Sequence, residues 1–304
     1  MNSTQNSSCS ASHGDLLIIV ESILLIIIAL LSQFFNLLCF RILTTASSGD
    51  VPNNVKVLLA FCNVAYLIRS FVIMTKALYN FYLITNGFDS FQITKFQCIV
   101  YEYFYLAPCM VVYLSTLLIG LERLRKTIQT HARDHDRVTF TKILCSSSSI
   151  TISVTILYAA LAFASDVTLQ SNEPMCYCYV LLAFSKNVSY IYTAGAISIQ
   201  IISCLIYFTV YKKNRKILDS FNLTSVEHDL SDRFIKNANI KACHWLTPVT
   251  LFHAATVIGV QLMATIIRSL SATGSETVGY IETVVASVCI FGFEAYAHPI
   301  LCIK

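Results

Sequence analysis

Long apolar blocks separated by short polar segments are the main pattern along this chain. Each block is longer than the roughly 20 residues that a helix needs to cross a hydrocarbon layer of about 30 Å. Short segments of alternating polarity, typical of β-barrel strands, do not stand out. The pattern predicts an all-α membrane protein, a seven-transmembrane helix bundle. The predicted spans are 16–40, 55–78, 98–121, 143–164, 187–211, 242–267 and 278–303.

Composition supports a membrane protein and excludes several other classes. Of the 304 residues, 56% are hydrophobic and only 12% are charged, whereas soluble domains carry about 25% charged residues. A soluble protein of this composition could not cover its surface with polar groups, and the mean hydropathy of +0.65 agrees. We therefore exclude a cytosolic enzyme, a nucleic-acid-binding domain and a disordered chain, and we expect the lipid bilayer as the surroundings.

Lysine and arginine are distributed unequally between the two sides of the predicted bundle. Sixteen of the 21 lie in the first, third and fifth loops and at the C-terminus, four lie in the other loops, and Arg69 lies inside a span. Because positively charged loops stay in the cytoplasm, we expect the N-terminus outside and the C-terminus inside. The chain then divides into an extracellular tail, 1–15, and a membrane domain, 16–304. Two sequons in the tail predict glycosylation of Asn2 and Asn6.

The twelve cysteines fall into two groups in this topology. Eight lie within spans or at the cytoplasmic face, where a thiol behaves as a small apolar side chain. Cys9, Cys98, Cys176 and Cys178 lie on the oxidising side. A disulfide from Cys98 to Cys176 or Cys178 would hold the second outer loop over the bundle, and free thiols are the alternative. The sequence leaves the partner of Cys98 and the state of Cys9 open.

Ionisable residues inside spans are candidates for functional sites, because their exposure to lipid is costly. Arg69, Glu102 and Glu294 are such residues. The spans of Arg69 and Glu294 are neighbours in a seven-helix bundle, so we predict an ion pair with either a structural or a ligand-binding role. Pockets for small molecules have few polar anchors. The predicted anchors are Glu102, Tyr105, Gln261 and Glu282. For the tyrosine, the alternative is an ordinary place in the interfacial aromatic belt.

Three short motifs lie near the inner ends of the predicted third, sixth and seventh spans. They are Glu122-Arg123 with Thr127, Leu230-Ser231-Asp232-Arg233-Phe234 with Asn239, and His298-Pro299-Ile300. The Asp-Arg-Tyr and Asn-Pro-x-x-Tyr motifs of rhodopsin-class receptors are degraded or replaced at these places. The motifs instead resemble those of the nematode serpentine chemoreceptors of the class alpha/beta group, which are G-protein-coupled receptors. The resemblance extends along essentially the whole chain.

The resemblance implies a chemosensory receptor, a multi-pass protein of the cell membrane, with sensory cilia as an expected location. It implies a small-molecule ligand at the outer mouth and activation of a heterotrimeric G protein at the cytoplasmic face. Coupling roles are implied for Glu122, Arg123, Arg233 and Phe234, and a bridge from the third span to the outer loop is usual in seven-helix receptors. The alternative for Arg123 is an ordinary positive flank. Because a residue at the interface can reach water, we expect its replacement to cost little stability.

Basic residues gather below the predicted fifth span, at Lys212, Lys213, Arg215 and Lys216. Together with a predicted helical extension over 224–241, they form a basic and partly apolar surface. A G protein could dock on this surface, or its charges could contact lipid headgroups. The sequence does not separate these two alternatives.

Other classes of function fit less well. A ligand-gated channel or transporter is the alternative, because polar residues in spans can line a path, but the odd number of spans and the lack of an internal repeat argue against it. We expect no enzymatic activity, since the histidines in 131–135 lie in a basic loop without a further Cys or Glu cluster. No metal or cofactor is expected, and the seventh span lacks the lysine that retinal would need.

Overall fold

The computed structural model describes residues 15–45, 53–86, 93–128, 174–175, 186–223, 240, 247–248, 250–259 and 262. Most of these residues belong to four long helices, which are α1 (Asp15–Thr45), α2 (Asn53–Asn86), α3 (Lys95–Ile128) and α6 (Lys186–Leu223). Two short strands, β1 (Ile93–Thr94) and β2 (Pro174–Met175), pair with each other, and a short apolar helix covers Thr250–Gly259. Each long helix contains a stretch that is long and apolar enough to cross a membrane.

The four long helices coincide with the predicted first, second, third and fifth spans and confirm them as helices of spanning length. The short helix falls inside the predicted sixth span, whereas 143–164 and 278–303 lie outside the described residues. The helices extend beyond the predicted spans, most clearly α6, which continues to Leu223. Apolar length marks only the part of a helix that lies in hydrocarbon, because polar side chains at its ends can reach water.

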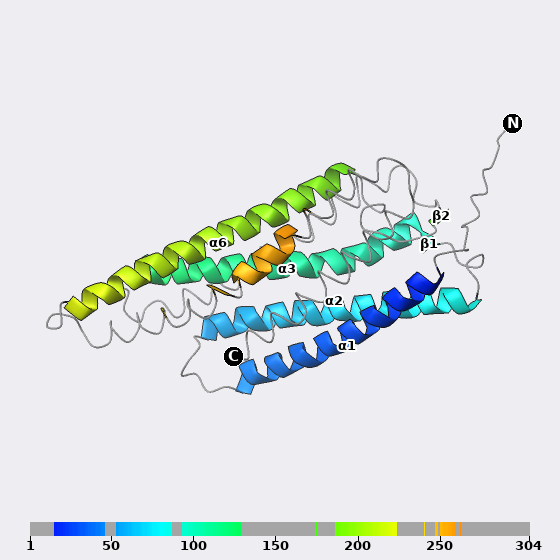
Figure 1. Cartoon of the computed structure of the whole chain (residues 1–304), viewed down its shortest axis with the longest axis horizontal. Coiled ribbons are helices and arrows are strands. Elements are labelled where there is room, and N and C mark those ends of the chain that lie inside the picture. The colour runs from blue at the N-terminus through cyan, green and yellow to red at the C-terminus, as the bar shows by residue number, and fades with distance from the viewer. Residues whose placement is uncertain are drawn as a thin grey trace.

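The long helices lie side by side with α1, α3 and α6 running in one direction and α2 in the other (Figure 1). In sequence order α1 packs on α2, α2 on α3, and α3 on α6. Strand β1 precedes α3 and pairs with β2, so this strand pair lies at the end of the bundle where α3 begins. Ile128 and Pro174 consequently lie at opposite ends of the bundle, and the predicted fourth span falls between them in the sequence.

Small and polar side chains form the contact between α1 and α2, while large apolar ones point outward. Ser32 and Asn36 are fully buried, and the Asn36 amide donates to the Ser32 carbonyl over 2.8 Å. Asn63 of α2 donates to the Cys39 sulfur over 3.4 Å. On the opposite side of α1, Phe34 is 61% exposed. This arrangement is expected in lipid, where close packing and hydrogen bonds between helices replace the hydrophobic driving force.

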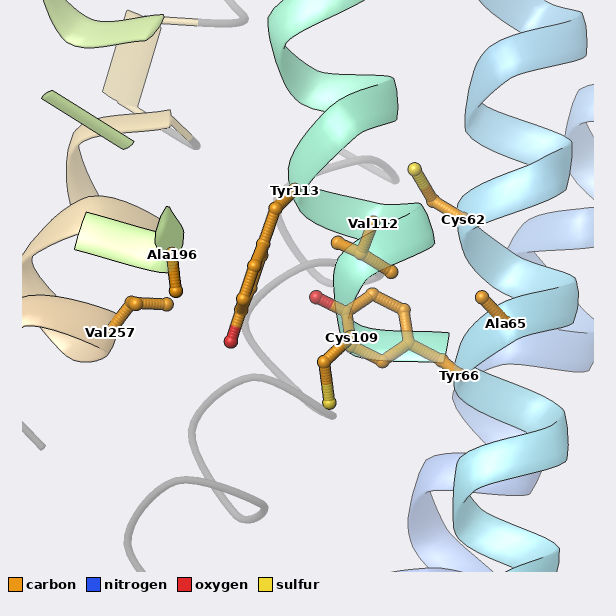
Figure 2. Close-up of a cluster of buried hydrophobic side chains, with 8 residues drawn as sticks. All are labelled: Cys62, Ala65, Tyr66, Cys109, Val112, Tyr113, Ala196 and Val257. Atoms are coloured by element: carbon orange, nitrogen blue, oxygen red, sulfur yellow. The ribbon is translucent and has the colours of Figure 1, made fainter. Parts of the chain in front are cut away.

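The centre of the bundle is a cluster in which α2, α3, α6 and the short helix meet. Its buried members are Cys62, Ala65, Tyr66, Cys109, Val112, Tyr113, Ala196 and Val257. Figure 2 shows the ring of Tyr113 standing between the side chains of Ala196 and Val257 on one side and those of α2 on the other. The cluster therefore fixes α3 as the central helix of the described part of the bundle.

The beginning of α3 is held by two local features. Thr94 and Gln97 form a reciprocal capping box, in which the Thr94 N–H donates to the Gln97 side chain over 3.1 Å and the Gln97 N–H donates to Thr94 Oγ1 over 3.2 Å. Cys98 is disulfide-bonded one residue later, with its partner outside the described residues. Ile93 pairs with Met175 across the two strands, which brings the residue before Cys176 to the start of α3.

Candidate functional site

The half of the bundle in which α3 begins, which the predicted orientation makes the outer half, contains a contact between α2 and α3 that is built on Arg69 and Tyr105. Arg69 Nη2 donates to the Tyr105 hydroxyl over 2.8 Å, and its Cζ lies 4.6 Å from the centroid of the same ring. Arg69 is only 2% exposed and Tyr105 is half-buried. The tyrosine thus satisfies part of a buried charge through both a hydrogen bond and a cation–π contact. Tyr105 therefore contacts a buried arginine of the neighbouring helix.

The middle of the bundle contains a buried polar group that joins three helices. The Tyr66 hydroxyl of α2 lies 2.9 Å from His253 Nε2, and Gln200 Nε2 of α6 lies 3.3 Å from His253 Nδ1. The ring of Tyr113 packs edge-on against His253 with the centroids 5.6 Å apart. All four residues are buried. We call Tyr66, His253 and Gln200 the central triad.

Both ring nitrogens of His253 have a partner within hydrogen-bond distance, which is the Tyr66 hydroxyl at Nε2 and the Gln200 amide at Nδ1. Hydrogen bonds between buried side chains of different helices favour one arrangement of those helices. The triad therefore ties the short helix to α2 and α6.

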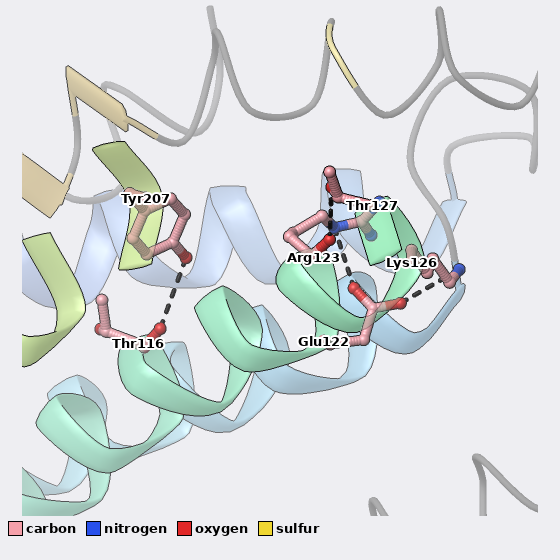
Figure 3. Close-up of polar contacts among 6 residues, drawn as sticks. All are labelled: Thr116, Glu122, Arg123, Lys126, Thr127 and Tyr207. Atoms are coloured by element: carbon pink, nitrogen blue, oxygen red, sulfur yellow. Dashed lines mark hydrogen bonds and ion pairs between the residues drawn. The ribbon is translucent and has the colours of Figure 1, made fainter. Parts of the chain in front are cut away.

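The half of the bundle in which α3 ends, which the predicted orientation makes the inner half, contains an acidic residue between two basic ones, all on α3 (Figure 3). Arg123 Nε lies 2.9 Å from Glu122 Oε2, and Lys126 Nζ lies 3.0 Å from Glu122 Oε1. Arg123 is 1% exposed and its backbone carbonyl accepts from the Thr127 hydroxyl over 2.8 Å. The expectation that Arg123 reaches water is wrong in this structure. Removing it would strand part of the charge of Glu122 in a buried position, so its replacement is costly.

Helices α3 and α6 pack closely against each other next to this group, on its N-terminal side along α3. The Tyr207 hydroxyl donates to the Thr116 carbonyl over 3.4 Å. A Cβ at Gly120 would lie 3.1 Å from Tyr207 Cε2 and 3.2 Å from Ile206 Cγ2. Glycine at this position allows the two backbones to approach, a common device in membrane helix pairs.

The three polar layers follow one another along α3. Tyr105 and Tyr113 are eight residues apart, and Tyr113 and Glu122 are nine apart, which corresponds to about 12 and 14 Å at 1.5 Å per residue. On α2, Arg69 follows Tyr66 at position i+3, so the two residues lie on one face of the helix. The outer and middle layers consequently share a face of α2.

Comparison with known protein families agrees with this helical membrane architecture. The chain matches the model of the serpentine type 7TM GPCR receptor class ab chemoreceptors over residues 9–290. It belongs to this family of seven-transmembrane chemoreceptors. The receptor is therefore a multi-pass membrane protein of a G-protein-coupled class, as its motifs suggested. None of the curated proteins compared with the receptor matches it significantly.

Several of the predicted site residues of the receptor lie outside the residues that the structure describes. Glu102 belongs to α3, but its side chain is not among those described. Also outside the described residues are Gln261, Glu282, Arg233, Phe234, Glu294, Cys176, Cys178, Asn2 and Asn6. The Arg69–Glu294 pair thus stays a prediction. The structure does bring Arg69 together with Tyr105, two residues that the sequence assigned to different roles.

Sequence reasoning missed the central triad, although a signal was present. His253 and Gln200 lie inside predicted spans, where polar side chains are expensive and face the bundle interior. A search for such residues that included histidine and glutamine would have found both. Their link to Tyr66 could not be found this way, because it depends on how three separate helices are rotated about their axes.

Proposed function

We propose that this receptor binds a small molecule in the outer half of the bundle and in response activates a heterotrimeric G protein at the inner ends of its helices. The observation that carries the proposal is the central triad, which joins α2, α6 and the short helix beside Tyr113, between Tyr105 and Glu122 along α3. The family supports a chemoreceptor role, and the receptor class is not known for enzymatic activity. The proposal includes an orientation in which the N-terminus lies outside the cell and the C-terminus lies inside.

On the ligand side, Tyr105 is the described anchor, and Glu102, Gln261 and Glu282 are its proposed companions. Arg69 holds the Tyr105 hydroxyl, so a ligand that displaces the ring would also change the position of the guanidinium. Because Arg69 and Tyr66 lie on one face of α2, this change reaches the central triad. Membership of the chemoreceptor family supports a small molecule as the ligand.

On the coupling side, we propose that Arg123 exchanges its contact with Glu122 for a contact with the G protein when the inner end opens. Arg233 and Phe234 are proposed to join it from the cytoplasmic extension of the sixth span. The contact with Glu122 lies within α3, so exchanging that contact does not by itself require α3 to separate from another helix.

The outer mouth is proposed to be closed by a disulfide between Cys98 and Cys176 or Cys178. The disulfide-bonded state of Cys98 and the pairing of Ile93 with Met175 both support this proposal. Sugars on Asn2 and Asn6 would lie on the same side of the membrane.

Nucleotide exchange tests the proposal directly. The purified receptor is reconstituted in lipid nanodiscs with a panel of heterotrimeric G proteins, and binding of a non-hydrolysable GTP analogue is measured with and without a pooled library of small molecules. We expect exchange above that of empty nanodiscs, and Arg123→Gln should lose it. The matched control is Lys126→Gln, which removes the exposed partner of the same glutamate.

Current recordings on cells that express the receptor test the alternative. The same library is applied while membrane current is measured. Current without exchange on any G protein would overturn the receptor proposal in favour of a channel or transporter.

A further inference from the structure

Helix α6 has one face toward the bundle and one face toward lipid. Buried residues recur along the first face at Ala196, Gln200, Ser203, Tyr207, Val210 and Asn214. The second face carries Ile201, Leu205 and Phe208 at helical spacing, and Leu205 and Phe208 are 60% and 55% exposed. Large apolar side chains turned outward on a spanning helix are in contact with lipid.

The four basic residues at the inner end of α6 continue the lipid-facing side. Lys212 and Lys216 follow Leu205 by seven and eleven residues, which returns them to the same side of a helix with 3.6 residues per turn. Lys212, Lys213, Arg215 and Lys216 are all exposed, while Asn214 between them is buried. We call these four residues the basic arc.

The basic arc lies at the depth of the lipid headgroups. The spanning stretch of α6 is Tyr190–Ile217, 28 residues, whereas about 20 residues cross the hydrocarbon and the headgroups extend the bilayer to about 40–45 Å. Lys212 Nζ lies 4.7 Å from the ring centroid of Phe208. Its alkyl chain therefore runs along the apolar surface and its ammonium group stays at the boundary, as expected for a lysine at a membrane interface.

We propose that the basic arc binds the phosphate and carboxylate groups of anionic phospholipid headgroups. The sequence left open whether these charges contact a G protein or lipid. The direction of the basic arc favours lipid, because the arc points away from the face on which α6 meets α3. Asp219 is the exposed acidic residue that follows, so positive charge prevails on this side. The inference goes beyond the proposed function and does not require a particular ligand or G protein.

Lipid binding by the purified full-length receptor in detergent tests the inference. Native mass spectrometry measures the affinity for short-chain phosphatidylserine and for short-chain phosphatidylcholine. We expect the wild-type receptor to prefer phosphatidylserine. The Lys212→Gln/Lys216→Gln double variant should lose about tenfold or more in phosphatidylserine affinity, since one basic residue near an anionic surface changes binding by about fivefold.

The matched control is the Arg41→Gln/Lys56→Gln double variant, which removes the same number of positive charges from the inner ends of α1 and α2. It should keep the preference for phosphatidylserine. Equal loss in both double variants would show that overall charge and not the arc binds the lipid, and would overturn the inference. So would equal affinity of the wild-type receptor for the two lipids.

The same variants separate this inference from the proposed function. Loss of G protein activation in Lys212→Gln/Lys216→Gln with unchanged lipid affinity would assign the arc to coupling and overturn the lipid assignment. Absence of nucleotide exchange in the wild-type receptor would contradict the proposed function alone, because the affinity for lipid is measured without a G protein.

Discussion

Removing the Tyr66 hydroxyl tests whether the central triad holds the receptor in its resting state. Tyr66→Phe deletes one oxygen atom from a fully buried ring and so changes the packing little. The contact with His253 Nε2, 2.9 Å long, is lost. Hydrogen bonds between membrane helices average about 0.6 kcal/mol and reach about 1.7 kcal/mol, and a buried polar group left without its partner costs about 1–3 kcal/mol. A change of about 1 kcal/mol is therefore a reasonable expectation.

Such a change corresponds to about a fivefold shift in the equilibrium between the resting and the active arrangement. If the contact exists only at rest, ligand-independent nucleotide exchange per receptor at the cell surface should rise by about that factor. The assay measures GTP-analogue binding on membranes, normalised to surface receptor by labelling of an N-terminal tag. The control is Tyr103→Phe, which removes a hydroxyl from a half-buried ring that packs on Phe104. Basal exchange equal to the wild type, or an equal rise in the control, would refute the reasoning.

Two replacements of His253 show which of its contacts matters. The amide of a glutamine at this position takes the place of Nε2, whereas that of an asparagine takes the place of Nδ1. His253→Gln should keep the contact with Tyr66 and signal like the wild type, and His253→Asn should resemble Tyr66→Phe. Combining Tyr66→Phe with His253→Asn should add nothing further, because both remove the same contact. If His253→Gln raised basal exchange and His253→Asn did not, the contact that holds the resting state would be the one with Gln200.

Four further predictions concern topology, the disulfide and helix packing. An N-terminal tag should be stained on intact cells and a C-terminal tag only after permeabilisation, and the reverse pattern would contradict the proposed orientation. Cys98→Ser should lower surface delivery, and normal delivery would show that its bridge is dispensable. Gly120→Ala should lower the thermal midpoint, because its Cβ has a neighbour at 3.1 Å, whereas Gly195→Ala, with nothing within 4 Å, should not; equal midpoints would refute the packing argument. Arg123→Ala should lower surface expression more than Lys126→Ala, whose side chain is 39% exposed before substitution, and equal expression would count against the burial of the arginine.

The apolar pattern was sufficient to predict the spans that the structure describes. A block of membrane length leaves few structural options, since only helices and closed barrels satisfy the backbone in lipid. The predicted spans 16–40, 55–78, 98–121 and 187–211 each fall within a long helix. Helix ends were less predictable, because hydropathy reports the hydrocarbon boundary and not the last hydrogen-bonded turn. The capping box of Thr94 and Gln97 marks such an end, and its Thr-x-x-Gln spacing is visible in the sequence.

Side-chain partners could be predicted only in part. The sequence identified Arg69 as a charge that needs a partner and proposed Glu294, which lies outside the described residues. It did not propose Tyr105, which lies across the α2–α3 contact and meets the guanidinium because of the rotation of both helices about their axes. The sequence pattern carries no information about that rotation.

The two buried arginines differ in a way that bears on their roles. The described contact of Arg69 reaches from α2 to α3, so separating Arg69 from Tyr105 changes the relation between two helices. The contact of Arg123 with Glu122 lies within α3, and breaking it needs no movement of the helix itself. In the exchange that we propose, Lys126 would remain as a positive partner of Glu122 after Arg123 turns away. We therefore propose that Arg69 senses a displacement of the helices and that Arg123 is released by it.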